Sequence, residues 1–167
     1  MLRVNTPESS RLAAEAMAQR VRAVAGQPPS GFVVQRMLSA GVEMIVGVVN
    51  DPLFGPIVAC GAGGLQVELL NDVSVRLSPL TCTDAQTMIR ELRTFPLLTG
   101  YRGAPGCAVG ALEDVVLRVA ALAEDHPQIA EIDCNPVIVT PSGAVVVDAR
   151  IRVDGPPPRR PLGARGN

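Results

Sequence analysis

The chain contains no lysine and very few aromatic residues. Every basic side chain is an arginine, and aromatic residues make up 2% of the 167 positions, with no Trp and one Tyr. Without lysine, the chain can supply no P-loop lysine, Schiff-base lysine or lysine phosphate clamp. The scarcity of aromatic rings and a net charge of −1 argue against a nucleic-acid partner. Any cation that this chain offers to a phosphate must therefore be an arginine.

Cysteine pairs at metal-binding spacing and long hydrophobic runs are also missing. Cys60, Cys82, Cys107 and Cys134 form no CxxC motif, and the sequence has one His. We expect all four cysteines to be small buried side chains in a reducing compartment. The N-terminus is polar, and no apolar run reaches transmembrane length. These features predict a cytoplasmic location and no membrane partner.

Hydrophobic residues make up 47% of the sequence, which is typical of a globular protein. Their spacing predicts helices at 8–25, 83–93 and 112–125. It predicts strands at 32–38, 43–49, 57–60, 65–70, 73–77, 128–134 and 144–150. This order of elements predicts an α+β domain with a mostly antiparallel sheet.

The most informative pattern is a pair of short strands that carry oxygen side chains. Glu131, Asp133 and Asn135 stand at alternate positions, so they share one face of a strand. Asp148 ends a second apolar run, and the turn 140–143 separates the two runs. A hairpin of this kind brings Asn135 beside Asp148, and such a pair suits Mg²⁺ on a nucleotide. The alternative is a polar strand edge that ends in an Asn-Pro turn.

Three further features are candidates for a phosphate site. Glycines at 55, 61, 63 and 64 allow a backbone to approach an anion, although an ordinary tight turn explains them equally well. Arg76 and Arg102 are suited to bidentate phosphate binding, and Arg102 lies close to two glycines. Glu68 follows the glycine loop within apolar strand sequence, where a carboxylate either faces solvent or has a function.

Together these segments resemble the ATP-grasp part of the NDP-forming acyl-CoA synthetases, which are relatives of the succinyl-CoA synthetase β subunit. Each matching stretch is short, but all occur in the family's order. The matching stretches are 34–37 with 41–43, 50–56, 61–64, 67–80, 97–103, 131–136 and 147–150. The resemblance implies the C-terminal ATP-grasp subdomain, with 1–30 as a joining helix and linker, 31–153 as the domain and 154–167 as a disordered tail.

The resemblance also implies roles for individual residues. The backbone of the hinge would contact adenine, and Asn135 and Asp148 would hold Mg²⁺ on the phosphates of ATP or ADP. The glycine loop would line the active-site side, as would the catalytic candidates Arg76, Glu68 and Arg102. The hinge residues are Gln35, Arg36, Met37 and Leu38, and the loop glycines are Gly61, Gly63 and Gly64.

The family converts acyl-CoA, ADP and phosphate to acid, CoA and ATP through a phosphohistidine on another domain or chain. Nothing in this sequence matches the first ATP-grasp subdomain, with its nucleotide-binding lysine, or the CoA-binding and phosphohistidine domains. We therefore expect a chain that acts as a ligase only with those parts or a partner subunit. The alternatives are a non-catalytic nucleotide-binding or assembly module and a truncated, inactive remnant.

Overall fold

The structure, a computed structural model, describes residues 4–64 and 71–155. It divides into two compact units, residues 1–39 and 40–167. The predicted strand 65–70, with Glu68, and nearly all of the predicted tail lie outside the described residues. None of the described helices is long and apolar enough to cross a membrane.

The first unit consists of one helix and an extended segment. Helix α1 (Pro7–Ala25) begins at a capping box formed by Thr6 and Ser9 and ends at Gly26, whose φ is +74°. No residue of α1 is buried. The prediction of a strand at 32–38 is wrong, because these residues have no regular secondary structure. A strand needs a hydrogen-bonded neighbour, and the described part of the chain provides none for this segment.

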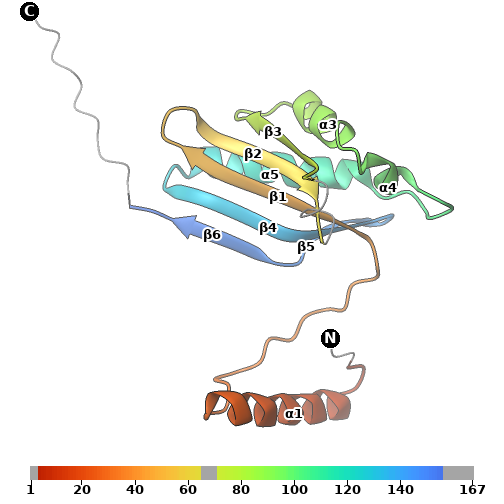
Figure 1. The fold of residues 1–167 in the computed structure, drawn as a ribbon, viewed down its shortest axis with the longest axis vertical. Coiled ribbons are helices and arrows are strands. Elements are labelled where there is room, and N and C mark those ends of the chain that lie inside the picture. Colours follow the sequence, from red (N-terminus) through yellow and green to blue (C-terminus); the bar gives the residue numbers. More distant parts are fainter. Residues whose placement is uncertain (1–3, 65–70, 156–167) are drawn as a thin grey trace, which may run out of the picture. The chain divides into compact units, whose positions relative to one another are not determined.

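The second unit is a six-stranded antiparallel sheet in the described residues, with helices packed on one face (Figure 1). The strands are β1 (Val42–Asp51), β2 (Gly55–Ala62), β3 (Val73–Leu77), β4 (Ile129–Thr140), β5 (Gly143–Val146) and β6 (Ala149–Val153). Their order is β3-β2-β1-β4-β5, and β6 also pairs with β4. The helices are α3 (Cys82–Arg90), α4 (Phe95–Thr99) and α5 (Val109–Asp125). The predicted α+β class is confirmed.

Alternation of side chains along the strands separates the sheet into two faces. On one face, Val46, Val58 and Ile132 are buried against the buried residues of α3 and α5, such as Ile89 and Val116. The opposite face, called the open face below, keeps apolar side chains half exposed. These are Val49 at 55%, Val73 at 36%, Val75 at 50% and Leu77 at 54% exposure. Within this unit, a ligand can therefore approach the sheet from the open face.

The four cysteines differ in their exposure to solvent. Cys60 and Cys134 are buried and Cys107 is half buried, but Cys82 is exposed in the first turn of α3. The prediction of four buried cysteines is therefore wrong for Cys82. Burial raises the pKa of the Cys60 thiol to about 12, so this side chain is a neutral part of the core.

A buried carboxylate connects the start of β3 to the turn between α3 and α4. Asp72 accepts hydrogen bonds from the backbone amides of Arg93 (2.9 Å) and Thr94 (2.8 Å) and from the Thr94 hydroxyl (2.6 Å). Burial alone would raise the pKa of Asp72, but these donors outweigh burial and hold the pKa below its ordinary value. The folded protein therefore stabilises the ionised carboxylate.

This arrangement predicts that Asp72→Asn lowers the free energy of unfolding at pH 7 by about 1–3 kcal/mol, because the amide leaves a buried N–H donor unpaired. Folding lowers the pKa of Asp72. The ionised carboxylate therefore contributes fully to the free energy of unfolding when the pH is well above the pKa of the unfolded chain. This contribution is lost as the pH falls through the pKa of the folded protein. The difference between wild type and variant should thus shrink on acidification below about pH 4. Urea unfolding across pH checks this, with the exposed Asp125→Asn as control. A difference independent of pH would contradict it.

Candidate metal–nucleotide site

Asn135 lies on β4, and Asp148 lies in the two-residue link between β5 and β6, both of which pair with β4. Cys134 pairs with Ala149 and Val137 pairs with Val146, so one continuous register places Asn135 opposite Asp148. The backbone amide of Asn135 donates to the carbonyl of Asp148 at 3.1 Å, and that of Val147 donates to the carbonyl of Pro136 at 3.0 Å. Directly opposed residues project from the same face. The predicted juxtaposition of Asn135 and Asp148 is therefore present.

A β-bulge marks the same point of β4. On β1, Met44 and Val46 are two positions apart, whereas their partners on β4, Val137 and Cys134, are three positions apart. The extra residue falls at Asn135–Pro136. On β4 before the bulge, Ile132 and Cys134 face the core. After the bulge, the residues that face the core are Val137 and Val139. Bulges of this kind redirect side chains and are frequent beside functional sites.

The donor set fits a magnesium ion bound to phosphates. Asn135 and Asp148 are both exposed, and they offer an amide oxygen and a carboxylate. Among the described residues, no group of three or more His, Cys, Asp or Glu side chains is placed to hold a metal ion. A two-ligand site suits Mg²⁺, which keeps several waters and commonly completes its shell with substrate phosphates.

Charged side chains continue along the same face toward the end of β6. Asp133 lies opposite Arg150, and Glu131 lies opposite Arg152. Arg152 is 2.6 Å from Asp154 and 3.4 Å from Glu131, and these bonds raise the pKa of Arg152 above its ordinary value. A hollow of about 280 Å³ is lined by Glu131, Asp133, Arg150, Ile151 and Arg152. Both signs of charge thus lie next to the Asn135–Asp148 pair.

Arg76 lies on the opposite face of the sheet from these charges. It pairs with Val58 in register, so it shares the face covered by helices, and its guanidinium is 2.6 Å from Glu91. Hydrogen bonding from Arg76 holds the pKa of Glu91 below its ordinary value. Arg76 also donates to the Ser74 hydroxyl at 3.2 Å and the Val75 carbonyl at 2.9 Å. These contacts hold Arg76 on the covered face and do not bring it to Asn135, and its catalytic role stays a prediction.

Arg102 is exposed in the loop between α4 and α5. Its backbone is left-handed, with φ of +52°, between Gly100 and Gly103, which also have positive φ. The guanidinium carbon lies 5.4 Å from the centroid of the Tyr101 ring, within the range of a cation–π contact. Arg102 is therefore available to an anionic ligand, and its catalytic role stays a prediction.

Two of the predicted loop glycines are explained by packing within the protein. A Cβ on Gly61 would lie 2.8 Å from the carbonyl oxygen of Asp72, and one on Gly63 would lie 2.8 Å from the carbonyl carbon of Glu43. The amide of Gly63 already donates to the Glu43 carbonyl at 2.7 Å. Gly64 has φ of +66°. The close approaches at Gly61 and Gly63 account for these residues without a ligand, and their nucleotide contact stays a prediction.

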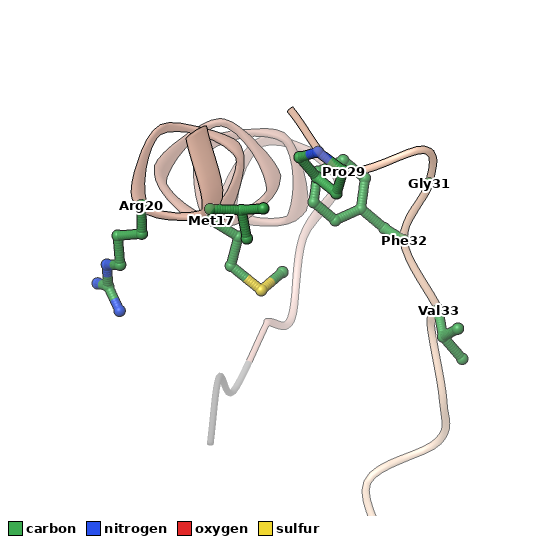
Figure 2. Close-up of a pocket in the computed structure, with 7 residues that line it drawn as sticks. Met17, Arg20, Pro29, Gly31, Phe32 and Val33 are labelled. Carbon is green, nitrogen blue, oxygen red and sulfur yellow. The ribbon is translucent and has the colours of Figure 1, made fainter. Parts of the chain in front are cut away.

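The predicted hinge residues lie in the first unit. Gln35, Arg36 and Met37 are exposed and Leu38 is half buried, and none of the four has regular secondary structure. The same unit contains an apolar hollow of about 410 Å³ between α1 and the segment that follows it (Figure 2). Its lining residues are Met17, Arg20, Val21, Pro29, Gly31, Phe32 and Val33. Because this hollow offers no carboxylate or amide side chain, it does not resemble a metal–phosphate site.

Comparison with known proteins decides the family. The family model described as "ATP-grasp domain" matches residues 1–153 of this chain. The chain belongs to the ATP-grasp family. The resemblance inferred from the sequence is thereby confirmed, and so is the ATP-grasp fold.

ATP-grasp relatives include subunits of acid–CoA ligases. The chain is 46% identical over 121 residues to the β subunit of ADP-forming acetate–CoA ligase I of Pyrococcus furiosus, covering 72% of this chain and 52% of that subunit. It is 39% identical over 161 residues to the β subunit of ligase II from the same organism, covering 93% and 67%. The chain thus spans between half and two thirds of the length of these subunits.

Solved ATP-grasp structures agree with this assignment. Acetyl-coenzyme A synthetase 1 of Ca. Korarchaeum cryptofilum, in complex with coenzyme A and Ca-AMPCP, superimposes with a TM-score of 0.83 at 39% identity. The match covers 92% of this chain and 67% of that one. A second structure of that enzyme, which holds coenzyme A and Mg-AMPPCP, gives a TM-score of 0.81 at 38% identity, with coverage of 92% and 67%.

The role of Gly63 in packing predicts opposite effects at two glycines. Gly63→Ala should lower the free energy of unfolding by about 1–3 kcal/mol, because the new methyl group would meet the β1 backbone. Gly110→Ala in α5 should raise it by up to about 1 kcal/mol, because a Cβ there meets nothing within 4 Å. Chemical unfolding of both variants checks this pair, and a neutral Gly63→Ala would contradict the packing account.

Proposed function

We propose that this chain is the nucleotide- and Mg²⁺-binding portion of an ADP-forming acid–CoA ligase. The reaction converts acyl-CoA, ADP and phosphate to acid, CoA and ATP through a phosphohistidine on another domain or chain. The observation that carries the proposal is the opposed pair of Asn135 and Asp148 on the exposed side of β4. The two acetate–CoA ligase β subunits support the choice of reaction.

In this proposal, the hairpin provides two fixed oxygen ligands for Mg²⁺ on the nucleotide phosphates. When bound, the metal would neutralise charge on the transferring phosphoryl group. The chain's own contribution is to place the amide of Asn135 and the carboxylate of Asp148 on one rigid face before the ligand arrives. Preorganised groups of this kind stabilise a transition state without reorganising during the reaction. Arg102 is the exposed cation proposed to contact the anionic substrate.

The partners are a further part of the proposal. The first ATP-grasp subdomain and a CoA-binding, phosphohistidine-bearing subunit would complete the enzyme. This assignment rests on the share of the relatives' β subunits that the chain spans and on coenzyme A in the Korarchaeum complexes. The half-exposed apolar residues Val49, Val75 and Leu77 give the open face the character of a surface that another domain covers.

Calorimetric titration with Mg·ADP tests the metal–nucleotide site. We expect the wild-type chain to bind and the variant Asn135→Ala/Asp148→Ala to lose binding by at least about a hundredfold, since both protein ligands of the metal are removed. Asp125→Asn, an exposed carboxylate at the end of α5, should bind like wild type.

Unchanged binding by the double variant would contradict the proposed metal site. Thermal unfolding of each variant separates this result from loss of the fold. Both substituted side chains are exposed, so the melting temperature should change little.

A further inference from the structure

Arg150 is a cation in this site that the sequence patterns did not single out. It follows Asp148 by two positions and lies opposite Asp133 in register, so it shares the face that carries the proposed metal ligands. It is exposed and lines the hollow of about 280 Å³. The local sequence pattern does not reveal this position, because it depends on the pairing of β6 with β4.

Arg150 and Arg152 differ in whether a carboxylate contacts the guanidinium. Arg152 is bound by two carboxylates, Asp154 at 2.6 Å and Glu131 at 3.4 Å. Within the described ranges 4–64 and 71–155, Arg150 has no carboxylate within 4.0 Å and no side-chain hydrogen bond, although Asp133 is its neighbour across the strands. Of these two arginines, Arg150 is thus the one whose donors are available to a ligand.

The distance between Arg150 and the metal ligands suits a shared phosphate ligand. Asp133, which lies opposite Arg150, and Asn135 are two positions apart on β4, so their Cα atoms are about 6.5–7 Å apart, a distance that a long arginine side chain can span. A metal ion bound by Asn135 and Asp148 would neutralise only part of the charge of a nucleoside di- or triphosphate. The fork of N–H donors in a guanidinium matches the remaining phosphate oxygens. The chain has no lysine for this purpose, and Arg76 lies on the other face.

We propose that Arg150 binds the phosphates of the nucleotide held at the Asn135–Asp148 pair. This inference rests on the proposed function and adds to it the residue that recognises the polyphosphate. Arg150 would act together with the metal.

The test compares Arg150→Gln with the matched control Arg152→Gln on the same strand. Titrations of the full chain use Mg·ADP and Mg·pyrophosphate, which has phosphates but no base. Arg150→Gln should weaken binding of both probes about tenfold or more, because a charge-assisted contact is lost. Arg150→Lys keeps the positive charge but loses the paired N–H donors of the guanidinium, so its affinity for both probes should lie between those of wild type and Arg150→Gln. Arg152→Gln should change the affinity by less than about twofold, because its charge already has two partners.

The outcomes distinguish this inference from the function on which it rests. If Arg150→Gln binds like wild type while Asn135→Ala/Asp148→Ala does not bind, Arg150 has no role in phosphate binding, but the metal site stands. If the double variant also binds like wild type, or the wild-type chain binds neither probe, the proposed site and the role of Arg150 both fall. Equal losses in Arg150→Gln and Arg152→Gln would also overturn the inference, because they would indicate a general effect of charge.

Discussion

The site depends on one backbone hydrogen bond, from the amide of Asn135 to the carbonyl of Asp148. This bond belongs to a register that runs from Glu131–Arg152 through Asp133–Arg150 to Val137–Val146. A shift of one residue would turn every side chain of one strand to the other face. The buried side chains of β4 prevent such a shift, because Ile132 and Cys134 must stay in the core. Packing on the covered face therefore determines which side chains of β4 lie on the open face.

One face of the sheet carries the residues that stabilise the fold, and the other carries the candidate binding residues. The covered face buries the branched and sulfur-containing residues and also carries the Arg76–Glu91 ion pair. The open face carries the oxygen ligands, Arg150 and a half-exposed apolar surface. Close backbone packing at Gly61 and Gly63 and the buried carboxylate of Asp72 support the strands from their edges. We therefore assign ligand binding to the open face, whose side chains the sheet itself positions.

Much of this could be predicted from the sequence, and the failures have physical causes. Two apolar runs around a Thr-Pro-Ser-Gly turn predicted the hairpin and the neighbouring positions of Asn135 and Asp148. Residues 32–38 are as apolar as a strand, but pairing depends on partners that a local pattern does not reveal. Arg76 is a candidate phosphate ligand by residue type, and only the register shows that it faces the helices, so its catalytic role stays a prediction. The bulge at Asn135–Pro136 depends on the pairing with β1, which no local motif encodes.

The most direct test of the account is paramagnetic line broadening in the NMR spectrum of the chain with Mn·ADP. If the Asn135–Asp148 pair holds the metal, broadening of the amide signals should be greatest at 133–135 and 148–150. It should be weak in the middle of α5, beyond the buried layer of the sheet. Broadening centred instead on Gly61, Gly63 and Gly64, or spread evenly over the chain, would contradict the claim that this hairpin binds the metal–nucleotide complex.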